Sequence, residues 1–210
     1  MASRVLALAL HIHEIIMADQ ALGAYGRSRS QSVVHKGILS PVCISSYHII
    51  QDIGGQDSKA IRLNENGEVV DFVMNDKCAA GTGRFLEMMA RTLEMDISEM
   101  GPESLKWKED IDISSMCSVF AESEVISLIT RNKETSDIAH GIHMAIAAKA
   151  ISLMRRVGLE PRFMMTGGVA KNPGVVKVLE EQLKAPLFIS EEPEIVGALG
   201  AALYGLENIL

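Results

Sequence analysis

The order of the predicted strands and helices is the feature that most constrains how this chain can fold. Three short segments with strand character come first. Residues 48–53 are largely apolar, and residues 58–64 and 68–74 alternate apolar and polar side chains on either side of the turn sequence NENGE. Helical and strand segments then alternate along the rest of the sequence. This order indicates an α/β fold in which helices cover a mixed sheet.

Capping residues, prolines and glycines delimit the alternating part. Strands are predicted at residues 162–166 and 186–189. Residues 107–112 and the Gly101-Pro102 pair show no such pattern and are expected to be irregular. The helices are predicted to begin at Thr82, at Ser114 or Ser115 ahead of CSVFAESEVISLIT, after Ser136-Asp137, at Asn172-Pro173 and at Pro193.

The composition limits the class of protein. Hydrophobic residues make up 48% of the 210 residues and charged residues 22%, which is typical of a globular chain with an apolar core. The net charge is −7 and there is no run of basic residues, so nothing suggests a nucleic-acid-binding surface. The cysteines number only 3, which argues against a disulfide framework and for a reducing cytoplasm.

The N-terminal stretch MASRVLALALHIHEII contains an apolar run that ends before His11. This run is shorter than the hydrophobic region of a signal peptide and far too short to span a membrane. We therefore expect an amphipathic helix that packs on the domain, and neither a signal peptide nor a membrane-spanning segment.

Two glycine pairs follow predicted strands, in DIGGQD (52–57) and TGGVAKN (166–172). A glycine pair at a strand end lets the backbone approach a phosphate or a nucleoside. Beside such a loop, Asp52 or Asp57 can hold hydrated Mg²⁺, and Gln56 can orient an attacking water. Each pair alone is also consistent with a plain turn, and neither matches the P-loop pattern. Two such loops in one chain favour nucleotide binding.

Cys78 and Cys117 share a context that Cys43 lacks, because each lies at or just before a predicted helix start, among small or hydroxyl residues. Free N–H groups at a helix start favour a thiolate. The alternative interpretation is that both cysteines are packed as small hydrophobic residues. Two thiolates are too few for a zinc or [4Fe–4S] site. If they are ligands, a second chain must supply the others, and a symmetric dimer would place the metal on its two-fold axis.

Other polar residues are interpreted more simply. Glu122 and Glu124 are expected on the solvent-facing side of a helix. His140 and His143 lie on the predicted long helix without a matching acid or ligand, so both are assigned structural roles.

Five segments together identify a family. They are DIGGQDSKAI, DFVMNDKCAAGTGRFLEMMARTLE, SSMCSVFAESEVISL, TGGVAKNPGVV and GALGAALYG. These segments resemble the activator (archerase) components of 2-hydroxyacyl-CoA dehydratases. The wider group is the BadF/BadG/BcrA/BcrD ATPase family, which includes subunits of ATP-dependent benzoyl-CoA reductases. The resemblance extends from about His48 to Gly205.

The resemblance implies an actin-like (ribonuclease-H-like) ATPase fold and a homodimer that holds one [4Fe–4S] cluster between its subunits. It implies that ATP hydrolysis drives one electron from the cluster into a 2-hydroxyacyl-CoA dehydratase or a related CoA-thioester reductase. Cys78 and Cys117 of each chain would hold the cluster. The implied ATP·Mg²⁺ site consists of Asp52 and Gln56 in catalytic roles, Gly54, Gly55 and Asp57 in the same phosphate loop, and Gly167 and Gly168 in the adenosine loop. The small-residue helix with Gly197 and Gly200 resembles the family's connecting helix.

The first 47 residues depart from the family pattern. Members begin with a half-domain that carries a phosphate loop of the DxGSTxxK kind, and nothing in residues 1–47 matches it. We therefore divide the chain into a divergent remnant of the first actin-like half, residues 1–47, and a second half, residues 48–210, that carries the cluster-binding helices. The alternative functions are a truncated copy without ATP turnover and a small-molecule kinase on the same fold, which would use Asp52 or Asp57 and need no iron.

Overall fold

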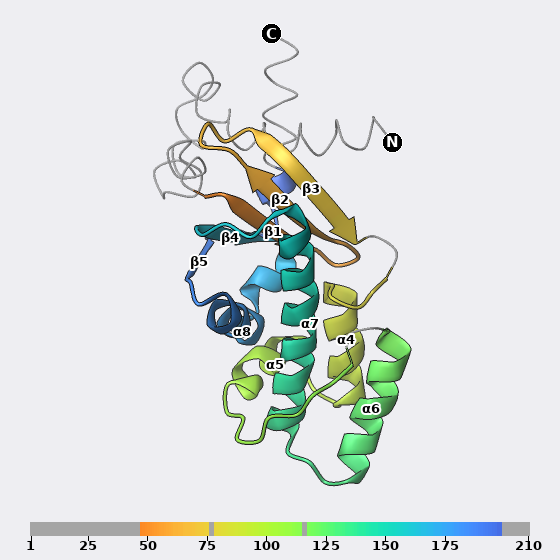
Figure 1. Ribbon diagram of the computed structural model, residues 1–210. Helices are drawn as coiled ribbons and strands as arrows, with labels where there is room; N and C mark the ends of the chain where they lie inside the picture. The colour runs from red at the N-terminus through yellow and green to blue at the C-terminus, as the bar shows by residue number, and fades with distance from the viewer. Residues whose placement is uncertain (1–46, 76–77, 115–116, 199–210) are drawn as a thin grey trace, which may run out of the picture.

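A five-stranded mixed sheet forms the centre of the molecule (Figure 1). The computed structural model describes residues 47–75, 78–114 and 117–198. The strands lie in the order β3-β2-β1-β4-β5. Their bounds are β1 (Ile49–Ile53), β2 (Ser58–Leu63), β3 (Val69–Asn75), β4 (Phe163–Thr166) and β5 (Leu187–Ile189).

The central strand β1 joins two kinds of pairing. It runs antiparallel to β2, the next strand in the chain, and parallel to β4, which comes much later. Beyond these neighbours, β3 continues the antiparallel side and β5 the parallel side. In the β1–β4 register, Asp52 lies beside Thr166. Because neighbouring parallel strands end at the same edge of a sheet, the loops after β1 and β4 leave it next to each other.

The helices form a layer on one face of the sheet (Figure 1). The longest helix, α7 (Thr135–Val157), packs against β1, β2 and β3. The other helices are α4 (Gly83–Thr92), α5 (Ile97–Ser104), α6 (Ser118–Thr130) and α8 (Pro173–Leu183), and a short 3₁₀ helix, η1 (Gly168–Lys171), leads into α8. Both α5 and α8 pack against α7, whereas α6 packs mainly against α4.

The main apolar core lies between the sheet and the helices. Ile49 and Ile53 of β1, Phe85 of α4, and Ile142 and Ile146 of α7 are at most 1% exposed. Full burial of a side chain of this size contributes roughly 1.5–3 kcal/mol. Alternate strand residues point to the opposite face, as the two-residue period of a strand requires. There, a smaller cluster contains Ile50, Ile61, Leu63, Met164 and Val196.

All five predicted strands are confirmed, with ends that differ by one residue. The predicted hairpin turn is also present, since the backbone N–H of Asn64 donates to the Glu68 carbonyl oxygen at 2.9 Å. The helix α4 begins after Thr82, and α8 begins after Asn172, which caps it. The helix α7 begins slightly earlier than predicted, at Thr135.

The prediction of an irregular segment around Gly101-Pro102 is wrong, because these residues belong to α5. The Asp96 side chain accepts a hydrogen bond from the first turn, and the Glu99 side chain accepts one from the Asp96 backbone, which together form a capping box. This cap starts a helix despite Pro102, whose missing N–H weakens only its second turn.

The predicted cap of α6 is also wrong. The N-cap residue is Cys117, and not Ser114 or Ser115. Its side chain makes no capping hydrogen bond. The predicted position of Cys117 at the start of a helix is therefore correct, although the serines do not play the expected part.

Several predictions lie outside the described residues. These are the N-terminal helix, almost all of the first-half remnant in residues 1–47, and most of the helix predicted from Pro193, including Gly200. Among the helices in the described ranges, none is long and apolar enough to cross a membrane.

Candidate nucleotide and cluster site

The glycine pair after β1 forms a tight loop that contacts the start of α4. The backbone N–H of Gly54 donates to the carbonyl oxygen of Asp57 at 3.0 Å, which closes the loop. The carbonyl oxygens of Gly54 and Gly55 accept from the backbone N–H groups of Gly83 and Arg84, each at 2.8 Å. The first N–H groups of a helix have no partner within it, and the loop supplies partners for two of them. The loop and α4 are thus fixed to each other.

The glycine pair after β4 begins with a residue that must be glycine. Gly167 has a φ of +87°, a conformation that other residues rarely adopt. A Cβ atom there would lie 2.3 Å from the carbonyl oxygen of Ile53 on β1. The backbone N–H of Gly167 donates to the Pro193 carbonyl oxygen at 2.8 Å. This close approach of the two strands places Gly168 at the start of η1.

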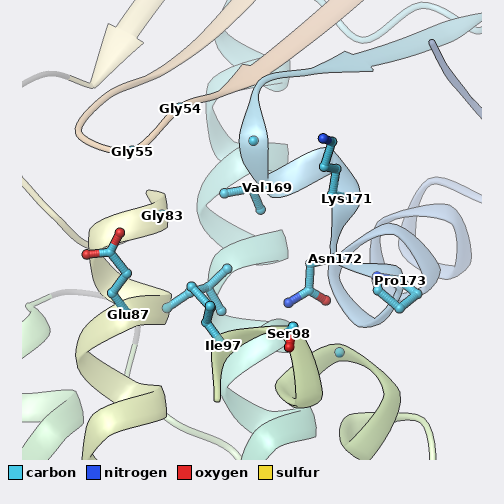
Figure 2. A pocket seen from close by; sticks show the side chains of 13 residues that line it. Gly54, Gly55, Gly83, Glu87, Ile97, Ser98, Val169, Lys171, Asn172 and Pro173 are labelled. Carbon is cyan, nitrogen blue, oxygen red and sulfur yellow. The ribbon is translucent and has the colours of Figure 1, made fainter. Parts of the chain in front are cut away.

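A pocket of about 370 Å³ lies between the two glycine loops and the helices α4 and α5 (Figure 2). In Figure 2 the loop of Gly54 and Gly55 lies on one side, η1 lies on the other, and α5 closes the pocket below. Gly54, Gly55 and Gly168 belong to its wall. The helices contribute Glu87, Ile97, Ser98, Lys171 and Pro173, and Asn172 lines the pocket between η1 and α8.

The second glycine of each pair has no visible structural reason to be glycine. Neither Gly55 nor Gly168 has a φ in the left-handed region. A Cβ atom added at either position would meet no atom within 4 Å. Because both residues line the pocket, such a side chain would enter open space that a ligand can fill. These two glycines keep the pocket open.

The carboxylates predicted to hold Mg²⁺ lie at the end of β1 and share one lysine. The Nζ atom of Lys59 lies 3.3 Å from Asp52 Oδ2 and 2.9 Å from Asp57 Oδ2. Asp52 Oδ1 accepts from the hydroxyl of Thr166 at 2.8 Å. Burial opposes the charge on Lys59, but the two carboxylates outweigh it and raise the lysine pKa above its usual range. The ammonium group of Lys59 thus orients both carboxylates.

Three predicted residues lie beside the pocket and not in its wall. Asp52, Gln56 and Asp57 are absent from its lining, and Gln56 is exposed. The fold nevertheless brings all three to the same edge of the sheet as both glycine pairs. The lining residue Lys171 pairs with Glu194 and lies 3.7 Å from Glu192, and the hydrogen bond with Glu194 raises its pKa.

Cys78 lies between β3 and α4, where its carbonyl oxygen accepts from the Asn75 side chain at 2.9 Å, and Cys117 lies at the start of α6. Both thiols are partly exposed, and neither forms a disulfide. Cys117 occupies the N-cap position of α6, and α6 packs against α4, which begins shortly after Cys78. The expected free N–H groups near Cys78 are not available at Gly83 and Arg84, because both donate to the loop after β1.

Comparison with known proteins identifies the family. Residues 17–205 match the profile of the BadF/BadG/BcrA/BcrD ATPase family. The chain belongs to this family.

Three curated relatives of this chain are named as activators of CoA-ester dehydratases. The chain is 47% identical over 159 residues to the 2-hydroxyisocaproyl-CoA dehydratase activator of Clostridioides difficile, and these residues cover 76% of this chain and 60% of the relative. It is 51% identical over 158 residues to the activator of lactoyl-CoA dehydratase of Anaerotignum propionicum, covering 75% and 61%. The identity to the (R)-2-hydroxyglutaryl-CoA dehydratase activating ATPase of Acidaminococcus fermentans is 43% over 206 residues, covering 94% and 79%. The chain thus spans about 60% of the length of the first two relatives.

Solved structures confirm the actin-like ATPase fold. The activator of the 2-hydroxyisocaproyl-CoA dehydratase from Clostridium difficile, determined with bound ADPNP, has a TM-score of 0.74 at 43% identity and is matched over 79% of this chain and 65% of its own. Component A of the (R)-2-hydroxyglutaryl-CoA dehydratase of Acidaminococcus fermentans has a TM-score of 0.73 at 45% identity, with 79% and 67% covered.

For this family member, sequence reasoning found the loops and missed most of the pocket wall. Ile97 and Ser98 escaped because α5 was not predicted, although the spacing of Asp96 and Glu99 is that of a capping box. The role of Lys59 could not be predicted from the sequence around it, because only the β1–β2 pairing places it opposite Asp52.

Proposed function

We propose that this chain is an ATP-dependent activator that transfers one electron to a 2-hydroxyacyl-CoA dehydratase or a related CoA-thioester reductase. One observation carries the proposal: Gly55 and Gly168, from two strand-end loops, open onto one pocket in a member of an ATPase family. Three relatives named as activators of 2-hydroxyacyl-CoA dehydratases suggest the class of partner.

ATP is proposed to occupy the pocket between the loops. Its volume of about 370 Å³ falls in the range of small-molecule sites, roughly 300–1,000 Å³. Gly54 and Gly55 would face the phosphates, since a backbone without side chains lets phosphate oxygens approach closely. The N–H of Gly54 itself donates to Asp57 and holds the loop in shape. Gly168, supported from behind by Gly167, would lie against the adenosine.

Mg²⁺ is proposed to lie near Asp52 and Asp57, with Gln56 orienting the attacking water. Both carboxylates already have Lys59 as a partner. Mg²⁺ usually keeps several of its waters, so the carboxylates can hold it through water without losing the lysine. In this arrangement Lys59 and Thr166 fix the direction of the Asp52 carboxylate.

Cys78 and Cys117 are proposed to hold a [4Fe–4S] cluster together with the same residues of a second copy. In the described part of one chain, no group of three or more His, Cys, Asp or Glu side chains is placed to hold a metal ion. Such a cluster takes four thiolates, which two symmetric chains supply. The partial exposure of both thiols leaves them accessible to a partner. When bound, the cluster would supply a one-electron carrier.

The surface of α6 supports contact with a second copy. Val119 and Phe120, in the first turn after Cys117, are 63% and 66% exposed, and Ile126, about two turns further along, is 50% exposed. Only Ala121 and Val125 of this helix are buried. Exposed apolar side chains gathered on one helix are typical of an interaction surface.

The nucleotide site is tested by filling the pocket from Gly168. Measured by calorimetric titration with ATP and Mg²⁺, affinity should fall with side-chain size, modestly for Gly168→Ala and about 30-fold or more for Gly168→Val. Gly168→Ala should unfold within about 1 kcal/mol of the wild type, because the added Cβ atom meets no protein atom within 4 Å. Unchanged ATP affinity in Gly168→Val would place the nucleotide elsewhere.

The activator function is tested with protein purified without oxygen. The protein, ATP and a one-electron reductant should together restore the activity of a purified 2-hydroxyacyl-CoA dehydratase, and omission of ATP should abolish the effect. An iron-loaded dimer that does not turn over ATP would instead favour a copy without turnover. A colourless protein that phosphorylates a hydroxyl group would favour the kinase.

A further inference from the structure

Asn172 links the pocket wall to the buried part of the fold. Its Oδ1 atom accepts from the backbone N–H groups of Gly174 at 2.9 Å and Val175 at 3.1 Å, which caps α8. Because the oxygen is held in this way, the amide nitrogen must point in the other direction. Figure 2 shows this nitrogen toward Ile97 and the oxygen toward Pro173.

The amide nitrogen of Asn172 meets a histidine on α7. Its Nδ2 atom lies 3.2 Å from Nε2 of His143, a residue with no exposed surface. An amide NH₂ group can only donate, so Nε2 must accept and carry no proton. The proton of the neutral imidazole then resides on Nδ1. Burial, reinforced by His140, lowers the pKa of His143 to about 3, consistent with a neutral ring at physiological pH.

The surroundings fix the ring in this orientation. Nδ1 of His143 is buried, and the described residues offer it no hydrogen-bond partner. A Cβ atom on Gly174 would lie 2.6 Å from Nδ1 and 2.2 Å from the hydroxyl oxygen of Ser104, so the ring is enclosed on this side. An unpartnered buried donor is costly, and a leucine would avoid that cost. Packing alone therefore does not account for a histidine here.

We propose that His143 is a positioning residue of the nucleotide site, whose Nε2 lone pair holds the Asn172 amide so that its second N–H is directed at an acceptor atom of the bound nucleoside. Asn172 lines the pocket and follows directly on the adenosine loop and η1. Its Nδ2 carries two hydrogens, and His143 takes only one of them. The inference rests on ATP as the ligand of this pocket. It replaces the purely structural role expected for His143 from the sequence.

The first test is spectroscopic and needs no ligand. Long-range ¹H–¹⁵N NMR of the full chain should show His143 with a protonated Nδ1 and an unprotonated Nε2 at pH 7. In Asn172→Asp the cap of α8 is retained, but an acceptor replaces the donor that faces Nε2. His143 should then become doubly protonated near neutral pH. Protonation at Nε2 in the wild type, or an unchanged spectrum in Asn172→Asp, would overturn the proposal.

The second test measures affinity for ATP with Mg²⁺. His143→Leu should weaken binding about threefold to tenfold, the effect of one misplaced hydrogen bond. His143→Gln restores an acceptor and should bind within about twofold of the wild type. His140→Leu is the matched control, because His140 lies three residues earlier on α7 and stacks on Trp107 at 4.2 Å between ring centroids. It should leave binding unchanged.

The outcomes separate this inference from the proposed function. A wild type that binds no ATP overturns both. If the wild type and His143→Leu bind ATP equally tightly, only the positioning role is overturned. If His143→Leu does not fold, Asn172→Asp decides, since it keeps the oxygen that caps α8 but removes both amide hydrogens. It should bind ATP more weakly than the wild type, and unchanged affinity would overturn the positioning role.

Discussion

The pocket and the proposed cluster site differ in how much of each site one chain contains. The pocket wall is built from loops, α4, α5 and the start of α8, all within the described residues. It is held by backbone hydrogen bonds, by the Asn172 cap and by buried side chains. Both cysteines are partly exposed, and Cys117 begins α6, a helix with few buried residues.

This difference shows which part of a site the fold itself organises. A pocket between packed elements is preorganised when the chain folds. The proposed cluster site, with two thiols per chain, would be completed only by assembly, so it would depend on concentration and on the second copy. Substitutions should therefore act on stability and nucleotide affinity in the first region, and on iron content and association in the second.

The largest expected effect is on iron. Cys78→Ser should lower the iron content of protein purified without oxygen from about two irons per chain to nearly none, since a cluster shared by two chains would lose two of its four ligands. Iron and sulfide analysis measures the effect. Cys43→Ser, at the third cysteine of the sequence, should retain its iron. Equal iron in wild type and Cys78→Ser would remove Cys78 from the site.

The next effect separates the two glycines after β4. Gly167→Ala should lose more than about 3 kcal/mol of unfolding free energy, because it combines a φ of +87° with a Cβ atom 2.3 Å from a carbonyl oxygen. Gly168→Ala should stay within about 1 kcal/mol of the wild type. Denaturant unfolding measures both. A similar loss in the two variants would contradict the division between a structural and a pocket-facing glycine.

A smaller effect should appear with pH. In the unfolded chain His143 binds a proton near pH 6.5, whereas in the folded chain it does so only near pH 3. Because only the neutral ring fits the folded state, the free energy of unfolding keeps its full value above pH 6.5 and decreases as the pH falls toward 3. The slope is about 1.4 kcal/mol per pH unit. Between pH 6.5 and 4.5, wild type should lose about 2–3 kcal/mol more than His143→Gln. Parallel stability curves would show that the folded His143 titrates normally.

The smallest effect is on association. Phe120→Ser should weaken dimerisation about tenfold, because a 66% exposed aromatic ring beside Cys117 would otherwise be buried against the second copy. Analytical ultracentrifugation across a concentration series measures this. Leu159→Ser, at a 44% exposed apolar residue beyond the end of α7, is the control and should not change it. Equal weakening in both variants would assign no special part to α6.

The sequence predicted the features that depend on local pattern. Alternation and turn residues located all five strands, and the glycine pairs located the two loops that meet at the pocket. The contributions of Lys59 and His143 could not be predicted, because β-strand pairing and helix packing bring them to Asp52 and Asn172. Pro102 concealed α5, although the Asp96–Glu99 capping box was visible.

The two hydrogen bonds between the loop after β1 and α4 have a mechanical consequence. If a ligand displaces the carbonyl oxygens of Gly54 and Gly55, either α4 moves with them or two bonds of about 1 kcal/mol each are broken. The segment that carries Cys78 enters α4 at this point, so such a displacement would be transmitted toward the cysteines. The amide protons of Gly83 and Arg84 therefore report on this movement, because they would exchange with solvent faster if the two hydrogen bonds were broken.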